Sequence, residues 1–599
     1  MDSALVVVKG IALTVLAFGL MIFVHELGHF LAAKLIGVRV DRFSFGMGPR
    51  LAGRKWGDTD YMISAVPIGG YVKMAGGDEG EEATGAPDEF VSKPPSRRAL
   101  VLVAGPLFSV LFGIPLAMGM FVLGRETFSS QVSYVALNSP AWDAGVRYGD
   151  RITALGSYPV TTFEELRQAV VRCGPNLFLD LVVERGGETH TLSIWHAKRQ
   201  PLGVFCQFIN TPVQVREVDR DAPAAEAGIR PGDVIESLEG KPVRDWADFR
   251  RRVLPHPGRP LQIALRRNGH PLTVTATPKA MEQPDPGFTV HLPREVGLVR
   301  KGFPADGKLR EGDRIVGVNG TAVTHWWEIE TAVAEGPANV KLAIERGREK
   351  LMVELQRGEG LRLADSLGIA PRPVFIVASI HQQTDPPLTI GDEIIKIGSV
   401  DTDEALAKEL LYEVPEDILA LLAKAGKVTV RRGAETFTVA FEPTVCQVGL
   451  LGIRPTWGTI THKKSLFGSV VPAIKETLSM STFVYVVLKR LVQGGVSPSD
   501  LMGPVGIGQH MYLAATSDIP NFLWLVHLIT VNIGVFNLIP IPPLDGGRLV
   551  MLAYEKVRGK QPSRRVMEAI MIAGIGIVVM IFLFATFNDL TRLFPRLFP

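Results

Sequence analysis

Four long apolar stretches divide the chain, at residues 4–35, 99–123, 522–541 and 566–587. Each is long enough to cross a bilayer as a helix, which takes roughly 20 residues. Between the second and third stretches lies a long region, residues 132–443, with short apolar runs, Gly and Pro punctuation and ordinary charge density. The pattern predicts a multi-domain membrane protein with an α-helical four-span core and a large inserted region.

A weaker apolar segment, residues 472–492, carries Lys475, Lys489 and Arg490. Cations on an otherwise apolar helix are typical of a helix that lies on the membrane surface. We therefore expect an amphipathic surface helix here rather than a fifth span.

Residues 39–98, which follow the first apolar stretch, are polar and rich in glycine. Residues 43–48 and 61–74 have the composition of short strands, and the Pro-Ile-Gly-Gly sequence at residues 67–70 predicts a turn. The segment is expected to form a small β-loop beside the first helix.

The inserted region contains internal repeats. Residues 139–152 are echoed by residues 222–235, and two weaker copies follow. A Gly-Asp pair recurs roughly every 80 residues, the length of one small domain. The four pairs are Gly149-Asp150, Gly232-Asp233, Gly312-Asp313 and Gly391-Asp392. Helix-like segments follow the first two pairs, at residues 162–172 and 246–253.

These repeats resemble PDZ domains, and the fourth copy is the weakest because it lacks the Ala-Gly that precedes the first two Gly-Asp pairs. The resemblance implies small α+β domains that bind peptide ends by adding a strand to a sheet edge. The last two copies could instead only fill space or block access. The expected domains are residues 1–125 with two spans and the β-loop, PDZ-like repeats at 126–197, 198–282, 283–357 and 358–444, a linker with the surface helix at 445–520, and two final spans at 521–599.

The sequence His25-Glu26-Leu27-Gly28-His29 lies inside the first apolar stretch. On a helix, four residues turn about 400° and rise about 6 Å, so both imidazoles project from one face. This spacing suits two nitrogen ligands of one Zn²⁺, with Glu26 as general base. Chance occurrence and a buried structural ion pair are the alternatives, although ionisable residues within a membrane span indicate function by default.

A zinc site needs a third protein ligand, and the end of the third apolar stretch offers Asp545 in the sequence Leu544-Asp545-Gly546-Gly547. Three prolines just before it break the helix and let the chain bend. The alternative role for Asp545 is to cap the next helix. Asn537 offers an amide that could hold a substrate carbonyl or a developing oxyanion, or could equally make a packing hydrogen bond.

The paired motifs, His-Glu-x-x-His in the first span and Asn-x-x-Pro-x-x-x-Leu-Asp-Gly-Gly after the third, resemble those of the site-2 protease family. The resemblance implies Zn²⁺ held by His25, His29 and Asp545, with Glu26 as the base and Asn537 assisting. It also implies that the β-loop pairs with the substrate strand, through Ile68, Gly69, Gly70, Tyr71 and Val72.

Two features depart from a bacterial member of the family that the chain resembles. The chain has room for four PDZ-like repeats where that protein has two, and Ser109 stands where it has Asn. Because of the first difference, what the family implies about control of substrate access by these repeats applies less directly to this chain.

Composition and charge narrow the alternatives. The net charge is only +3, and there is no basic stripe with interleaved aromatic residues, so we expect no nucleic-acid partner. The three cysteines, Cys173, Cys206 and Cys446, are too far apart for a zinc cluster or a disulfide framework. We expect buried free thiols, and the alternative is that Cys173 and Cys206 pair in an oxidising compartment.

The segment between the last two spans carries Lys556, Arg558, Lys560, Arg564 and Arg565 against Glu555. The positive-inside rule places that segment in the cytoplasm. With four spans, both termini and the repeats then lie outside the cytoplasm, and the candidate zinc site lies near the cytoplasmic side of a bacterial inner membrane.

The sequence therefore predicts a zinc-dependent intramembrane endopeptidase that cleaves transmembrane segments of membrane-protein substrates. The family suggests regulated intramembrane proteolysis, for example of an anti-sigma factor after a first cleavage. The main alternative is a non-catalytic membrane scaffold that binds peptide ends through PDZ-like domains; a metal-binding transporter is disfavoured because there are four spans and no inverted repeat.

Overall fold

The computed structural model describes residues 3–593 apart from short gaps, of which the longest are residues 78–83, 206–212, 403–421 and 495–501. The chain separates into two compact units. The membrane unit comprises Met1–Thr127, Val171–Gly174 and Thr461–Pro599, and the repeat unit comprises Phe128–Val170 and Pro175–Ile460.

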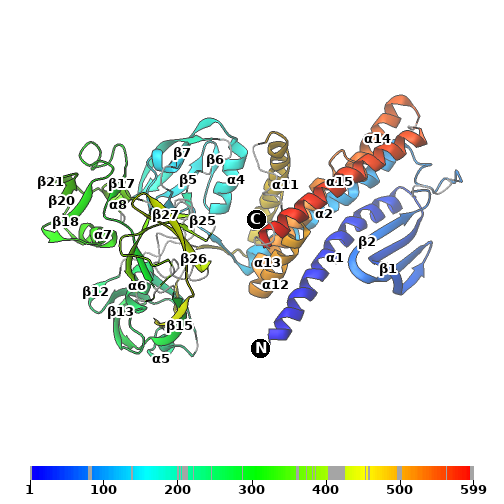
Figure 1. The fold of residues 1–599 in the computed structure, drawn as a ribbon. Coiled ribbons are helices and arrows are strands. Elements are labelled where there is room, and N and C mark those ends of the chain that lie inside the picture. The colour runs from blue at the N-terminus through cyan, green and yellow to red at the C-terminus, as the bar shows by residue number, and fades with distance from the viewer. Residues whose placement is uncertain are drawn as a thin grey trace. The chain divides into compact units, whose positions relative to one another are not determined.

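Long helices make up most of the membrane unit (Figure 1). They are α1 (Ser3–Leu35), α2 (Pro95–Leu123), α11 (Val470–Val492), α12 (Pro504–Ser517), α13 (Ile519–Asn537), α14 (Asp545–Arg558) and α15 (Arg564–Leu593). Within the described residues, five segments are long and apolar enough to span a membrane: Val7–Leu35, Pro95–Leu123, Phe467–Leu491, Ile519–Asn537 and Arg565–Thr591.

Four of these segments coincide with the predicted apolar stretches. The fifth lies on α11, which we expected at the membrane surface, and its mean hydropathy of 1.2 is the lowest of the five, against 1.6 to 2.7 for the others. The structure thus offers one candidate span more than the sequence predicted, and the four-span core stays a prediction.

Small residues allow α1 and α13 to approach α2 closely. A Cβ atom on Gly28 of α1 would lie 2.4 Å from the Ala104 carbonyl oxygen, and one on Gly534 of α13 would lie 2.8 Å from that of Pro106. Both contacts fall on the small-residue part of α2, as is usual where membrane helices pack tightly. The His-Glu-x-x-His sequence on α1 is therefore held directly against α2.

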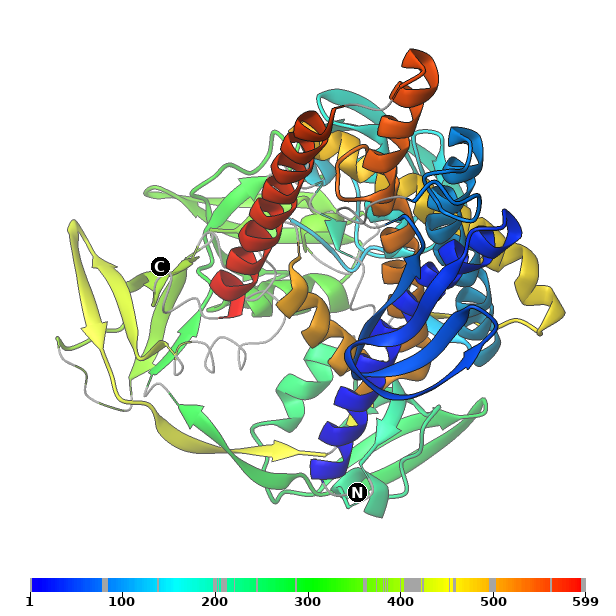
Figure 2. The ribbon, with the colours of Figure 1, turned by 90° about the vertical axis from the view of Figure 1, so that its right-hand side faces the viewer.

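The predicted β-loop is present as β1 (Val40–Trp56) and β2 (Thr59–Met74), which lie alongside α1 (Figures 1 and 2). Phe43 of β1 pairs with both Tyr61 and Val72, so the first part of β1 lies between the two halves of β2. Its ring also stacks on Phe30 of α1, with 4.6 Å between ring centroids. In the part of the chain that the structure describes, no further strand pairs with the second half of β2, which is therefore an edge.

The turn predicted at residues 67–70 is wrong, because β2 continues through it. The register jumps here: Met47 pairs with Val66 and Phe45 with Gly70. Gly69, with φ of +100°, adopts a backbone conformation that other residues rarely reach. An irregularity within the strand, rather than a turn between two strands, accounts for the Pro-Ile-Gly-Gly sequence.

Each sequence repeat in the repeat unit forms a small sheet with its own strands. The first has β5 (Arg151–Leu155), β7 (Leu177–Arg185) and β8 (Glu188–His196); the second has β10 (Val213–Val218), β11 (Val234–Leu238), β13 (Leu261–Arg267) and β14 (His270–Ala276). The third has β18 (Arg314–Val318), β20 (Asn339–Arg346) and β21 (Glu349–Gln356); the fourth has β23 (Phe375–Ile380), β24 (Glu393–Ile397), β26 (Lys427–Arg432) and β27 (Glu435–Ala440). The helices expected in the first two repeats are confirmed as α4 (Phe163–Cys173) and α6 (Trp246–Val253).

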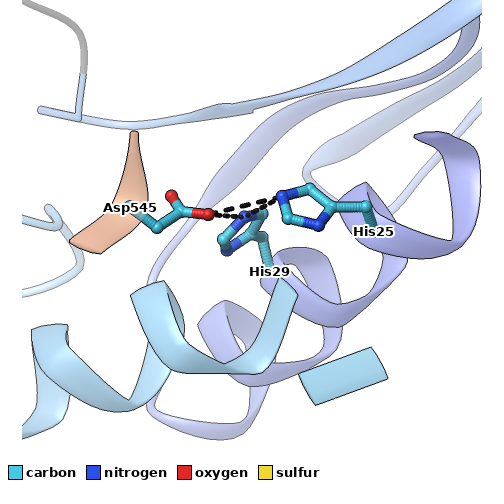
Figure 3. A group of neighbouring side chains, drawn as sticks. All are labelled: His25, His29 and Asp545. Carbon is cyan, nitrogen blue, oxygen red and sulfur yellow. Dashed lines mark hydrogen bonds and ion pairs between the residues drawn. The ribbon is translucent and has the colours of Figure 1, made fainter. Parts of the chain in front are cut away.

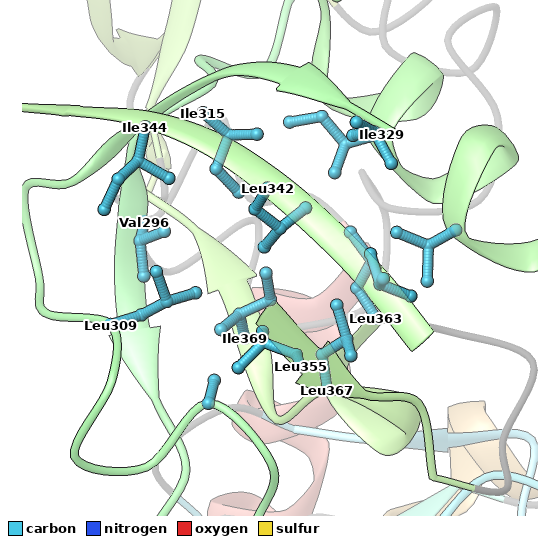
Figure 4. Packing of buried hydrophobic residues seen from close by; sticks show 14 of the residues in the cluster. Val296, Leu309, Ile315, Ile329, Leu342, Ile344, Leu355, Leu363, Leu367 and Ile369 are labelled. Atoms are coloured by element: carbon cyan, nitrogen blue, oxygen red, sulfur yellow. The ribbon is translucent and has the colours of Figure 1, made fainter. Parts of the chain in front are cut away.

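The repeats have separate hydrophobic cores, since three distinct clusters of buried residues fall in the second, third and fourth copies. Figure 4 shows the third core, where side chains from several strands and from α7 (Trp326–Glu335) meet. They include Ile315, Leu342, Ile344, Leu355 and Ile329. A separate core in each copy is what small, individually folded domains require.

The recurring Gly-Asp pair has a structural role that is the same in all four copies. The Asp side chain is at most 1% exposed and pairs with an Arg on a later strand at 2.6–2.7 Å. The pairs are Asp150–Arg185, Asp233–Arg267, Asp313–Arg346 and Asp392–Arg432. Each Asp also accepts a hydrogen bond from the backbone N–H three residues before it. The fourth copy, the weakest in sequence, keeps this contact.

The closing strands of the repeats show that the repeats are nested rather than strung in sequence. The first copy is closed by β9 (Val204–Phe205), which pairs with β4 (Tyr134–Val135), and the third by β22 (Ile369–Pro371), which pairs with β17 (Val296–Val299). The second copy is closed by β29 (Ile453–Pro455), which pairs with β10 and follows the third and fourth copies in the sequence. The fourth is closed by β16 (Phe288–His291), which precedes the third copy and pairs with β23.

The third and fourth copies therefore lie between β14 and β29 of the second. The chain leaves and returns through an antiparallel pair, β15 (Lys279–Asp285) and β28 (Thr444–Leu450). The expected linker at residues 445–520 thus begins with strands, one of which belongs to the second repeat. A second motif marks the closing strands: Leu202-Gly203-Val204, Leu367-Gly368-Ile369 and Leu451-Gly452-Ile453.

The leucine of that motif makes an equivalent hydrogen bond in three copies. Its carbonyl accepts from the backbone N–H of Ala141 in the first copy, Ala305 in the third and Ala224 in the second, at 2.9–3.1 Å. This recurrence could have been found in the sequence, and it would have revealed the insertion. The alternative pairing of Cys173 with Cys206 lies outside the described residues, because Cys206 is not among them.

Candidate metal centre

Helix α1 runs without interruption through the His-Glu-x-x-His sequence, so the two histidines lie one turn apart on the same face. His25 and His29 are each 7% exposed. Their Nε2 atoms are 3.3 Å apart. Two acceptor nitrogens this close repel each other unless a proton or a cation lies between them, and this arrangement favours a metal ion.

The third donor comes from Asp545, 516 residues after His29 in the sequence (Figure 3). Its Oδ2 atom lies 3.3 Å from Nε2 of His25 and 3.4 Å from Nε2 of His29. For a tetrahedral ion with ligands at about 2.05 Å, the ligand atoms are about 3.3 Å from one another. The three side chains therefore fit a zinc ion, with one position of the tetrahedron left for water or substrate.

The other ring nitrogens are held by α2. Nδ1 of His29 lies 2.8 Å from the Val101 carbonyl oxygen, to which it donates, and Nδ1 of His25 lies 3.1 Å from the Ser109 hydroxyl. A proton on Nδ1 leaves the lone pair of Nε2 available, and such contacts orient metal-binding imidazoles. Ser109, at which the sequence departs from a relative, thus has a direct role in orienting His25.

Gly105 of α2 leaves the space that the His29 ring occupies. A Cβ atom built on Gly105 would lie 2.2 Å from Nε2 of His29 and 2.5 Å from its Cε1 atom. These distances are far below van der Waals contact, so any larger residue at position 105 would displace the imidazole or the helix.

The glycines after Asp545 bring α14 into position. A Cβ atom on Gly546 would lie 2.3 Å from the Leu538 carbonyl oxygen, and one on Gly547 would lie 2.3 Å from the backbone nitrogen of Pro542. The first turn of α14 is therefore packed against the turn that leaves α13. Asp545 is the first residue of α14 and follows the N-cap residue Leu544, so it is not itself the N-cap of that helix. Its carboxylate points toward the histidines, not the helix end.

Glu26 and Asn537 lie beside the three donors. The Glu26 carboxylate accepts a hydrogen bond from the backbone of Val72 in β2, and Nδ2 of Asn537 lies 3.5 Å from Nε2 of His25. Together with the donors they line a cavity of about 440 Å³. Every residue predicted as a ligand, the base or the assisting amide thus lies at one cavity.

The predicted substrate-binding residues are only partly at this cavity. Val72 lines it, while Gly69, Gly70 and Tyr71 precede it along β2. Gly70 is close to the site, since a Cβ atom there would lie 3.7 Å from Cγ of Glu26. Ile68 belongs to the same strand, and its side chain is outside the described residues. Met74 and Arg548 also line the cavity and were missed in the sequence.

Comparison with known proteins agrees with the geometry. The model of peptidase family M50 matches residues 13–581. The chain belongs to peptidase family M50. The five apolar helices found in the described part of this M50 peptidase are in keeping with a membrane metalloprotease.

Relatives extend along the whole of this M50 peptidase. The regulator of sigma-E protease RseP of Salmonella typhimurium is 25% identical, over 97% of this chain and 98% of its own length. Putative zinc metalloproteases of Neisseria meningitidis and Chlamydia trachomatis are 22% and 26% identical, each over 97% of this chain and 98% of its own length. The resemblance to the site-2 protease family is confirmed, and the names of these relatives support Zn²⁺ as the metal of the family.

Proposed function

We propose that this M50 peptidase is a zinc-dependent intramembrane endopeptidase that cleaves transmembrane segments of membrane-protein substrates. The observation that carries the proposal is the tetrahedral spacing of three donor atoms from His25, His29 and Asp545, next to Glu26, on a helix able to span a membrane. When bound, zinc would act as a Lewis acid on the attacking water and the substrate carbonyl.

Glu26 would act as the general base and then the general acid. It takes a proton from the attacking water and delivers it to the amide nitrogen as the C–N bond breaks. Its hydrogen bond from the Val72 backbone orients the carboxylate within the cavity. Asn537 would donate its amide N–H to the substrate carbonyl oxygen, where negative charge develops.

The free edge of β2 is the proposed place for the substrate chain. A peptide bond within a helix is shielded by the helix's own hydrogen bonds, so the substrate must unwind locally before it reacts. An unwound segment could add to the second half of β2 as a strand, from Ile68 to Val72, and reach the cavity at Val72. The peptide would then pass directly beside Glu26.

The charge distribution supports an orientation in the bacterial inner membrane. Lys556, Arg558 and Lys560 follow α13, and Arg564 and Arg565 precede the apolar part of α15. If the repeats lie outside the cytoplasm and α11 lies on the membrane surface, α13 crosses inward and this segment is cytoplasmic. If α11 also crossed the membrane, the segment would lie outside, against the positive-inside rule. With α11 on the membrane surface, the site would be near the cytoplasmic side.

The repeats are proposed to act as extracytoplasmic PDZ-like domains that admit substrates already cut by another protease, as in regulated intramembrane proteolysis. An anti-sigma factor is one substrate of this kind. The scaffold alternative assigns these domains only a peptide-binding role and gives no reason for the three-donor cluster at the cavity.

Two measurements on detergent-purified full-length protein test the proposal. Glu26→Gln should abolish cleavage of a transmembrane substrate while the protein keeps about one zinc per chain. Asp545→Ala should lose zinc, measured by metal analysis. Retained turnover in the Glu26 variant, or a well-folded wild type that takes up no zinc when it is supplied, would contradict the proposal and favour the scaffold.

A further inference from the structure

Arg548 is a cation at the catalytic cavity for which the proposed chemistry has no use. It lies on α14 three residues after Asp545, and its side chain is exposed where it lines the cavity. Residues three apart lie on neighbouring parts of one helix face, about 4.5 Å apart along the axis. The side chain therefore starts from the same face as the proposed metal ligand.

The position of Arg548 is fixed by the close packing of the first turn of α14. Gly546 and Gly547 press that turn against the Leu538 and Pro542 backbone, with no room for a Cβ atom. The other wall of the cavity includes Val72 and Met74 of β2. A substrate strand along β2 would therefore run past the guanidinium.

The negative charges of the cavity are directed elsewhere. Oδ2 of Asp545 faces the two histidines, and Glu26 accepts a hydrogen bond from Val72. Within the described residues, no hydrogen bond or ion pair joins Arg548 to another side chain. By contrast, two other arginines have partners on α14. Arg98 of α2 pairs with Glu555, and Arg558 lies over the Tyr554 ring, 6.0 Å from its centroid.

We propose that Arg548 binds a carboxylate group of the peptide in the cavity, and this rests on the proposed function. A guanidinium holds a carboxylate by two parallel hydrogen bonds, and its charge does not depend on pH in the ordinary range. Because the cavity opens from helices that can span a membrane, an anion there is costly unless a cation accompanies it. Arg548 supplies that cation.

The carboxylate has two possible sources. Hydrolysis adds water across the C–N bond and leaves one new carboxylate and one new amine, so every turnover creates such a group in the cavity. The other source is an acidic side chain of the substrate next to the cleaved bond. In the first case Arg548 governs product release; in the second it selects substrates.

Binding of short fluorescein-labelled Leu/Ala peptides to zinc-loaded full-length protein distinguishes these sources. The Glu26→Gln form is used throughout, so that no peptide is cleaved. One pair of peptides differs only in a C-terminal carboxylate or amide, and a second amidated pair differs only in one internal Glu or Gln. Fluorescence anisotropy gives each dissociation constant, and metal analysis confirms equal zinc content.

We expect the carboxylate member of one pair to bind about 10- to 100-fold more tightly than its neutral partner, as for a charge-assisted hydrogen bond. Arg548→Gln should remove most of that preference, and Arg548→Lys should keep part of it. Arg558→Gln, on the same helix but outside the cavity lining, is the matched control and should change nothing. A preference in the first pair identifies the product carboxylate, and one in the second pair identifies a substrate side chain.

The inference is overturned if neither pair shows a preference, or if Arg548→Gln at full zinc content keeps the preference of the parent. Zinc alone would produce that second result, since it can also bind a carboxylate. Failure of the proposed function is a separate observation: protein with Glu26 intact would not cleave, while the binding difference would remain.

Discussion

Substitution of Gly105 by alanine should dismantle the proposed zinc site without introducing any polar or charged group. The new methyl group would lie 2.2 Å from Nε2 of His29. An ordinary contact between such atoms is about 3.5 Å, so the overlap exceeds 1 Å. The imidazole cannot keep its position unless α1 and α2 separate.

Separation of the two helices is itself opposed by their packing. Gly28 and Ala104 are in close contact, and the Nδ1 atom of His29 is bound to the Val101 carbonyl. Moving His29 breaks that hydrogen bond and withdraws one of the three proposed metal ligands. Loss of an outer-shell partner alone typically costs 10- to 100-fold in metal affinity, and the displacement of a ligand should cost at least as much.

The assay is zinc affinity by competition with a chromogenic chelator, alongside cleavage of a transmembrane substrate. Gly119→Ala is the matched control, because it lies on the same helix and its Cβ would meet only the end of the Leu523 side chain, at 3.2 Å. The control should bind zinc and cleave normally. Normal zinc affinity and turnover in Gly105→Ala would refute the reasoning.

Three further predictions concern the metal and the repeats. Ser109→Ala should weaken zinc binding about 10-fold or more, because the hydroxyl 3.1 Å from Nδ1 of His25 is lost, while Ser109→Asn should keep most of the affinity. Equal zinc affinities in the wild type and both variants would contradict this prediction. Chelation should abolish cleavage and added zinc should restore it, whereas activity that survives in metal-free protein would exclude a zinc mechanism. Asp392→Asn should destabilise the fourth repeat by about 1.5–3 kcal/mol, because a buried charge-assisted pair with Arg432 is lost. The measurement is hydrogen exchange of residues 375–440 in the full chain, where protection should fall. Unchanged protection would show that the fold does not need the pair. Burial raises the pKa of Asp392, but hydrogen bonds from Arg432 and Thr389 outweigh burial and hold that pKa below its ordinary value. The stabilisation by the Asp392–Arg432 pair should therefore be complete above about pH 4, near the pKa of the unfolded state, and should fall as the pH drops through the lower pKa of the folded state. Exchange measured across that range should show no such loss in the asparagine variant.

The sequence alone determined the local features of this protein. Membrane-length apolar helices, the one-turn spacing of His25 and His29, and the helices of the first two repeats depend on residues close together in the chain, where helical periodicity decides the outcome. Asp545 was predicted as the third ligand from the proline and glycine pattern around it and from the family resemblance, because spacing alone cannot relate residues so far apart. The recurring Gly-Asp pairs likewise revealed four copies.

Tertiary structure decided what depends on contacts between distant segments. The donor distances near 3.3 Å, the space that Gly105 leaves for His29 and the partners of both Nδ1 atoms arise from the packing of α1, α2 and α14. Insertion of the third and fourth repeats into the second depends on β29, a strand of three residues, whose pairing with β10 is set by a partner more than 200 residues away. The sequence of such a short strand contains too little pattern to predict its pairing partner, because the sheet that the strand completes determines both partner and register.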